Sequence, residues 1–375
     1  MRFAALDSWR GLCALGVVLF HFKYFCAALV FAPLTYGYLF VDFFFVLSGF
    51  VLAHAYGGAI QGFRDVPAFL ARRLGRIYPL HVAVLAAIVM VELGRAGSGE
   101  GFAAPNGALT FVENLFLVQA LDPDGYVSWN QASWSLSVEF WAYVAFALSL
   151  VATARAPKGV RPILFAILAI LGSAMAFSAA KGAIDFGAEV AFPRGLCGFF
   201  AGALASEVYR ALAPAARRMP RWAAGALETA MIALVLAFVA LAGPNRLSFA
   251  APPVFFAATL TFAMERGALS QALKWAPLRA LGEWSYSIYM THLFLMLPFA
   301  VLATRLLKGA TEPFGPQITA SWPLGAAVTL AYLGLVVAVS SQTHRYIEAP
   351  CRRRVNALVE RGLPVASAQP APSAA

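Results

Sequence analysis

The stretch that decides the fold is residues 6–22, which read LDSWRGLCALGVVLFHF. Arg10 and His21 bracket an apolar run, and their eleven-residue spacing corresponds to about 16 Å along a helix. Arg10 can then face the headgroups of a membrane while His21 lies near mid-bilayer. An ionisable side chain at that depth is costly and usually faces a partner or a cavity. His21 is therefore the first candidate for a functional residue.

Composition places the whole chain in the same class. Of the 375 residues, 61% are hydrophobic and only 12% are charged, about half the charged share of ordinary globular domains. We predict an all-α, polytopic transmembrane helical bundle of about ten spans, because apolar runs of about 20 residues recur along the chain. We expect one transmembrane domain over 1–361 and a disordered tail over 362–375. The predicted spans are 11–30, 38–56, 79–94, 134–153, 162–180, 193–210, 222–242, 248–264, 284–306 and 322–343.

The basic residues indicate the orientation of these spans. Most of the 28 lysines and arginines fall in alternate loops, so the positive-inside rule places both termini in the cytoplasm. Segment 106–121 is short and carries polar residues, and a span there would invert every later loop; we predict a re-entrant or interfacial helix on the outer side. Segments 62–78 and 267–282 mix basic and apolar residues and are typical of interfacial helices. The net charge of +10 is thus a topology signal, and we predict no nucleic-acid partner.

Two carboxylates lie inside predicted spans. Asp42 is in the outer third of VDFFFVLSGF (41–50), and Glu139 lies in WSLSVEFW (134–141). An unpaired carboxylate in hydrocarbon is expensive, so both are functional candidates that we expect to line a cavity open to the outer side. Trp134 belongs to an outer aromatic belt on which a sugar ring could stack. Ser48 and Gly49 are better explained by close helix packing.

Further polar groups complete the candidates. Arg73 and Arg76 are three residues apart on one helical face and could hold phosphates in a fork geometry, although anchoring at the membrane surface explains them equally well. His292 is a second imidazole inside a span. Near the C-terminus, Pro350 is expected to stop the last helix, and Glu348 to pair with a nearby arginine. The four cysteines have no metal-ligand spacing, so we predict no metal.

Taken in order, these motifs resemble the acyltransferase 3 family of bacterial integral membrane acyltransferases. The resemblance covers about residues 5–355. The motifs that carry it are Leu6 to His21, Val41 to Phe50, Arg73 to Pro79, Trp134 to Glu139, Ser285 to His292 and Glu348 to Pro350. Each motif alone is weak, but the ordered set is specific.

The resemblance implies transfer of an acyl group, usually acetyl, from cytoplasmic acyl-CoA to a hydroxyl of an extracytoplasmic or lipid-linked carbohydrate. It implies a multi-pass protein of the bacterial cytoplasmic (inner) membrane, surrounded by lipid and without the extracytoplasmic hydrolase-like domain that many relatives carry. Arg10, Arg73 and Arg76 would hold the phosphates of the co-substrate. His21 would be catalytic with Glu139 or Asp42, and Trp134 and His292 would meet the acceptor.

Several alternatives remain open at this stage. His21 could act as a general base or could carry the acyl group covalently. Intramembrane His, Asp and Glu residues also form proton relays, so a proton-coupled secondary transporter is the main rival, although no inverted repeat is visible. A flippase or scaffold would leave the paired arginines unexplained. The sequence does not identify the acceptor, which could be a small hydrophobic alcohol, or the oligomeric state.

Overall fold

A computed structural model of the chain describes residues 3–26, 34–122, 127–180, 182–184, 187–307 and 322–362. These residues form helices, turns and loops without a strand, and ten helical segments are long and apolar enough to cross a membrane. The prediction of an all-α, polytopic bundle is confirmed. The part of the predicted disordered tail after Gly362 lies outside the described residues.

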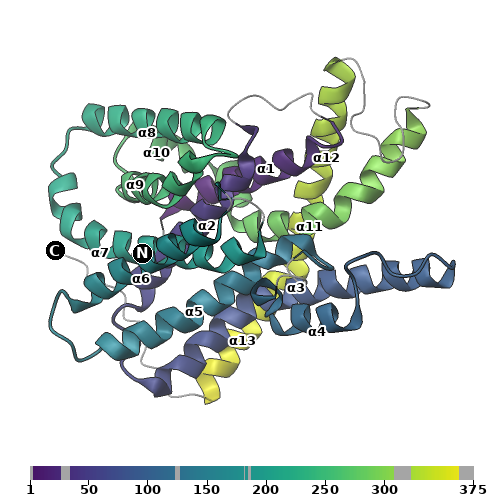
Figure 1. Cartoon of the computed structure of the whole chain (residues 1–375). Coiled ribbons are helices and arrows are strands. Elements are labelled where there is room, and N and C mark those ends of the chain that lie inside the picture. Colours follow the sequence, from purple (N-terminus) through teal and green to yellow (C-terminus); the bar gives the residue numbers. More distant parts are fainter. Residues whose placement is uncertain are drawn as a thin grey trace.

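Figure 1 shows the helices gathered into one bundle. Their bounds are α1 Ala4–Phe22, α2 Phe40–Tyr56, α3 Val66–Gly97, α4 Ala108–Phe116, α5 Trp134–Thr153, α6 Val160–Ala179, α7 Ala188–Ala216, α8 Arg221–Leu241, α9 Ala251–Ala263, α10 Ala268–Leu273, α11 Ala276–Leu306, α12 Trp322–Thr343 and α13 Ala349–Gly362.

Three predicted boundaries need correction. The basic segment 62–78 is not a separate interfacial helix, because residues 66–78 are the first half of α3, which is 32 residues long. Segment 267–282 likewise divides into the short α10 and the first turns of α11. The first span was predicted too late, since α1 ends at Phe22. In each case a polar stretch was taken as a helix boundary although the helix continues through it.

The segment predicted to be re-entrant or interfacial is α4, whose nine residues are too few to span a bilayer. It lies beside α3 (Figure 1), where the Tyr78 hydroxyl donates to the Leu115 carbonyl at 2.8 Å. Leu117 ends the helix in the left-handed region, at φ 57°. Its carbonyl accepts hydrogen bonds from Ser137 Oγ and Trp141 Nε1 of α5, at 2.7 and 2.9 Å. These two bonds hold the strained turn against the bundle.

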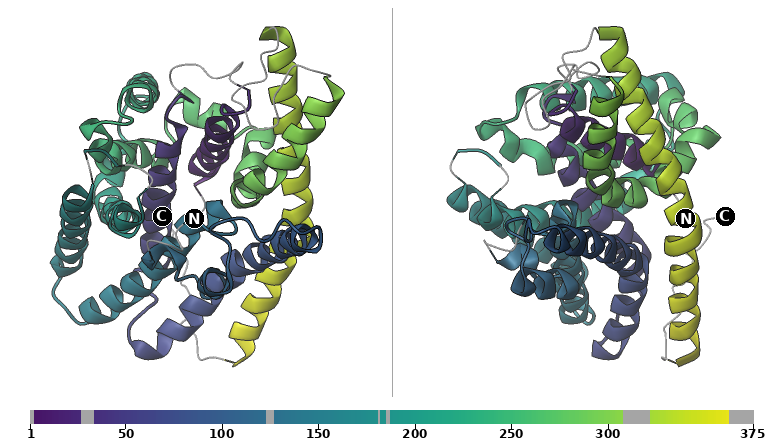
Figure 2. Two further views of the ribbon diagram at one scale, coloured as in Figure 1. Left: turned by 45° about the vertical axis from the view of Figure 1, so that its right-hand side comes forward. Right: turned by 90° about the vertical axis from the view of Figure 1, so that its right-hand side faces the viewer.

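The expectation that Pro350 stops the last helix is wrong. After α12 the chain passes through a π-helical turn, His344–Glu348, and continues directly into α13. Figure 2 shows α12 and α13 as one long rod along the side of the bundle. Pro350 is tolerated because it lies in the first turn of α13, following the wider π turn.

Glycines allow the two closest helix crossings at the centre of the bundle. A Cβ on Gly49 of α2 would overlap the Phe199 carbonyl of α7, and a Cβ on Gly202 of α7 would overlap the Val46 carbonyl of α2. The predicted packing role of Gly49 is therefore confirmed. Gly11 of α1 and Gly282 of α11 approach each other in the same way.

The relative direction of α2 and α7 tests the predicted number of membrane crossings. Helices α2 and α7 run parallel, since Asp42 pairs with Arg194 near their starts and Arg210 reaches the Ala53 carbonyl near their ends. They are the second and sixth candidate spans, so parallel packing requires an odd number of crossings between them, and the three spans α3, α5 and α6 satisfy this. A crossing at α4 would have reversed one of them. The ten-span count is thus consistent with the packing.

We expect Gly49→Ala and Gly202→Ala each to destabilise the bundle by about 1–3 kcal/mol or more, because the added methyl has no space beside the facing carbonyl. The matched control is Gly334→Ala on α12, where an added Cβ would meet no atom within 4 Å. Thermal unfolding of the three purified variants in one detergent checks this. Equal melting temperatures for Gly202→Ala and Gly334→Ala would contradict the proposed crossing.

Candidate active site

A cavity lies between α1, α2, α3, α5 and α11, with about 840 Å³ of empty space when the open solvent at its mouth is included. Its wall combines apolar side chains with several charged and hydroxyl groups. The polar members are Arg10, Ser48, Arg73, Arg76, Ser135, Glu139, Tyr143, Ser285, Tyr286 and Tyr289. The structure therefore brings together the three arginines predicted to bind a co-substrate, from two different helices, with one of the three predicted catalytic residues.

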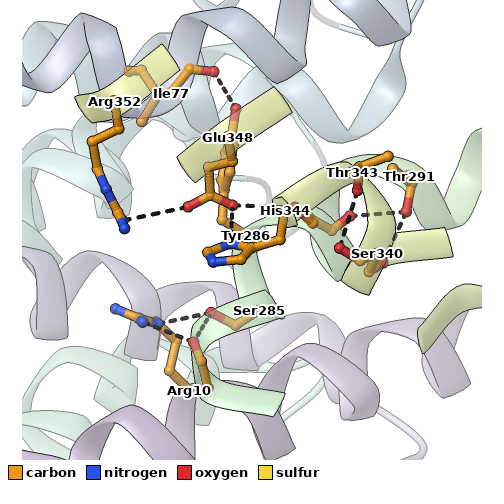
Figure 3. A network of polar contacts seen from close by, with 12 residues as sticks. Arg10, Ile77, Ser285, Tyr286, Thr291, Ser340, Thr343, His344, Glu348 and Arg352 are labelled. Atoms are coloured by element: carbon orange, nitrogen blue, oxygen red, sulfur yellow. Dashed lines mark hydrogen bonds and ion pairs between the residues drawn. The ribbon is translucent and has the colours of Figure 1, made fainter. Parts of the chain in front are cut away.

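The three arginines that line the cavity differ in their hydrogen-bond partners and in their burial. Arg10 is held by α11, since its Nε donates to Ser285 Oγ and its Nη2 to the Gly282 carbonyl, both at 2.8 Å (Figure 3). Arg73 donates to the Tyr56 hydroxyl at 3.2 Å, but its Nε is buried without a partner in the described part of the chain. Arg76 is partly buried, and the charged groups that act on it include Glu139 and Glu348. Of the three guanidinium groups, Arg73 is the one with a buried nitrogen that has no partner in the described part of the chain.

Glu139 does not lie where the sequence suggested. It was expected on the outer side, opposite the arginines, but it lines the same cavity as they do. Its Oε1 accepts hydrogen bonds from the Ser48 hydroxyl at 2.6 Å and from the Tyr143 hydroxyl at 2.5 Å. Ser48 was assigned to packing only, and Tyr143 was missed. Tyr143 is one helical turn after Glu139, which is the only sequence signal that could have indicated the pair.

The structure pairs the two intramembrane histidines, which are 271 residues apart in the sequence. His21 Nδ1 lies 3.1 Å from His292 Nε2, across the contact between α1 and α11. His292 is completely buried, and its carbonyl accepts a hydrogen bond from Tyr332 of α12 at 2.6 Å. The expectation that His292 meets an acceptor directly is therefore not supported by its complete burial.

The hydrogen bonds select one tautomer for each ring. His292 Nδ1 lies 2.6 Å from the Tyr289 carbonyl, and His21 Nδ1 lies 3.0 Å from the Val17 carbonyl. Carbonyl oxygens only accept, so in a neutral pair both Nδ1 atoms carry the proton. His292 Nε2 then accepts from His21 Nδ1–H. His21 Nε2 keeps its lone pair, and it has no partner among the described residues.

Tyr289 lies between the cavity and the histidine pair. Its ring lines the cavity and contacts His292, with ring centroids 5.8 Å apart. Phe44, another lining residue, packs edge-on against Tyr289 at 5.8 Å, and the Ser135 hydroxyl donates to the Tyr289 hydroxyl at 2.9 Å. His21 does not line the cavity in this state, and the side-chain contacts lead to it from Tyr289 through His292.

The expectation that Asp42 lines a cavity is wrong. Asp42 is completely buried and accepts two hydrogen bonds from Arg194 of α7, at 2.8 and 2.7 Å. Trp134 is also buried, with the Arg194 guanidinium 5.7 Å from its ring, so it is not a platform for a sugar. Nothing in a single sequence links Asp42 to Arg194, which is 152 positions away.

Comparisons with known proteins identify the family of the chain. A family model described as an acyltransferase domain, that of the acyltransferase 3 family, matches residues 3–341. The chain is 28% identical to acyltransferase MdmB of Streptomyces mycarofaciens, over 98% of this chain and 95% of that protein. It is 29% identical to the exopolysaccharide production protein ExoZ of Rhizobium meliloti, over 78% of this chain and 87% of that protein. No solved structure gives a significant match.

We expect Asp42→Asn to lower the free energy of unfolding by about 3–5 kcal/mol, because it leaves the Arg194 guanidinium buried without its counter-charge. The double variant Asp42→Asn/Arg194→Gln should recover part of this loss, which a double-mutant cycle on thermal unfolding measures.

The control is Glu100→Gln, whose carboxylate forms an exposed pair with Arg95 at 3.6 Å. Exposed pairs contribute little, so its melting temperature should not change. Strictly additive effects of the Asp42 and Arg194 substitutions would show that the pair does not stabilise the bundle.

Proposed function

The chain belongs to the acyltransferase 3 family and is a multi-pass membrane protein, and we propose that it moves an acyl group from acyl-CoA to a hydroxyl of a carbohydrate acceptor. The observation that carries the proposal is the cavity itself. Three arginines line it, and Tyr289 of its wall contacts His292, the partner of His21, whose Nε2 keeps its lone pair.

The donor that suits this cavity is acyl-CoA, with acetyl-CoA as the simplest case. Its phosphates would bind Arg10, Arg73 and Arg76, since guanidinium groups form charge-assisted, fork-like hydrogen bonds with phosphate. The pantetheine arm would follow the apolar wall inward. The thioester would pass Tyr289 and Phe44, whose rings must move aside to admit it. No metal is needed for this chemistry.

The transfer itself would use His21 Nε2 as general base. This nitrogen accepts the proton of the acceptor hydroxyl while the hydroxyl oxygen attacks the thioester carbonyl carbon. The new C–O bond forms and the C–S bond breaks. The CoA thiolate then takes the proton from His21. The products are an ester and free CoA, so atoms and charge balance.

Glu139 would act on the donor side. With Ser48 and Tyr143 it forms a hydrogen-bonded group next to Arg76, and we propose that it orients this guanidinium. Asp42 takes no part in this scheme, because its partner is Arg194.

The acceptor and the location are further parts of the proposal. ExoZ is described as an exopolysaccharide production protein, which favours a sugar hydroxyl outside the cytoplasm or on a lipid carrier. The basic loops favour a bacterial cytoplasmic membrane with the arginine cavity facing inward. The first test is whether the purified protein in nanodiscs releases free CoA thiol from acetyl-CoA when envelope glycans are supplied. Proton-coupled flux without thiol release would favour the transporter reading instead.

We expect His21→Ala to lower turnover by at least about a hundredfold while leaving donor affinity and melting temperature near normal, because only the base is lost. The matched control is His54→Gln in the last turn of α2, where the imidazole packs among Phe3, Phe50 and Tyr209. Thiol release measured on both variants gives the comparison. Near-normal turnover of His21→Ala would remove His21 from the chemistry.

Arg73→Ala and Arg76→Ala should each weaken acetyl-CoA binding by roughly ten- to a hundredfold, since each removes a charge-assisted contact worth about 1.5–3 kcal/mol. Arg64→Ala is the control, because Arg64 is exposed just before α3. Isothermal titration calorimetry on the three variants measures the affinities. If all three bind like the wild type, the paired arginines serve only as membrane anchors.

A further inference from the structure

The last helix brings another arginine to the arginine cluster. Glu348, the final residue of the π turn, is 2% exposed and has three partners. His344 Nδ1 lies 3.0 Å and Ser287 Oγ 3.1 Å from its Oε2, and Arg352 Nη1 lies 3.7 Å from its Oε1. Figure 3 shows Glu348 between His344 and Arg352. Arg352 therefore leaves the helix on the side that faces the bundle.

Helix α13 packs directly on the paired-arginine segment of α3. A Cβ on Gly75 would meet Val355 of α13 at 2.6 Å, and Gly75 immediately precedes Arg76. Arg352 is three residues before Val355, so both lie on the same face of α13. The charges of Arg73 and Arg76 both act on Arg352, which agrees with this placement.

The cluster carries an excess of positive charge. The charged groups that act on one another here are the arginines Arg73, Arg76, Arg352 and Arg353 and the carboxylates Glu348, Glu139 and Asp7. The Arg352 side chain is still 39% exposed despite its contact with Glu348. Neighbouring positive charges repel each other, so this cluster of arginines favours the binding of an anion.

Arg352 is outside the set of residues that line the cavity, whereas Arg73 and Arg76 line it. The Arg352 side chain, which is 39% exposed and pairs with Glu348, therefore lies beside the cavity wall and reaches solvent. Acyl-CoA carries a diphosphate next to its pantetheine arm and a separate 3′-phosphate on the ribose at its far end. With the thioester directed inward, the 3′-phosphate is the outermost anionic group.

We propose that Arg352, held in place by Glu348, binds the 3′-phosphate of acyl-CoA and so makes the protein selective for CoA thioesters over their 3′-dephospho forms. This inference rests on the proposed function. Glu348 acts as a positioning residue, since it contacts Arg352 and not the donor. The π turn sets the direction of this contact, because its extra residue changes which face of α13 meets α3.

The test compares the affinities of acetyl-CoA and 3′-dephospho-acetyl-CoA for the same protein preparation in nanodiscs, at low salt. The wild type should prefer acetyl-CoA by about tenfold, as one charge-assisted contact implies. Arg352→Ala should abolish this preference. Arg354→Ala is the matched control, because it removes an exposed arginine two residues away, and it should keep the full preference. Arg352→Lys should keep part of it, since the charge remains and the fork is lost.

Each outcome is decisive, because a folding defect would lower both affinities together and leave their ratio intact. A tenfold preference that persists in Arg352→Ala overturns the inference. So does a wild type that binds both thioesters equally, and in that case the proposed acyl transfer still stands. A folded wild type that binds neither thioester contradicts the proposed function itself.

Discussion

A polar group inside a bilayer must find its hydrogen-bond and charge partners within the protein, and the rest of this structure depends on that constraint. Asp42 and Arg194 satisfy each other completely. Glu139 is satisfied by Ser48 and Tyr143. Two groups keep an atom without a partner among the described residues: the Arg73 guanidinium at Nε and His21 at Nε2. Function is therefore best sought where pairing is incomplete, and charge alone is a poor guide to it.

The parallel contact of α1 with α11 arranges these groups in order. Arg10 bonds to Ser285 near the start of the contact, and His21 bonds to His292 further along it. Tyr289 lies between Ser285 and His292 and closes the inner end of the cavity. Two helices distant in the sequence thus define a path from an anion site to a base. The glycine contact of Gly11 with Gly282 allows the close approach that this path needs.

The sequence predicted the parts of this account that depend on local pattern. The number of spans followed from hydropathy, and the pairing of Arg73 with Arg76 from their spacing. The position of His21 was predicted wrongly, because α1 ends at Phe22 and His21 lies in its last turn instead of midway along it. Pairings between distant helices could not be predicted, because no periodicity links Asp42 to Arg194 or His21 to His292. As a result, Asp42 was assigned to a cavity it does not reach, and Trp134 and His292 to an acceptor. The helix boundaries at α3 and at Pro350 were also missed, since tertiary contacts carry both helices through segments that appear to interrupt them.

The central claim is that the arginine cavity and His21 belong to a single donor path. An experimental structure of the protein with a non-hydrolysable acetyl-CoA analogue tests it most directly. The account predicts that the diphosphate lies against Arg73 and Arg76, that Tyr289 and Phe44 have moved aside, and that the carbonyl mimic points toward His21 Nε2. An analogue bound outside this cavity, or bound within it with its acyl end directed away from His21, would contradict the account.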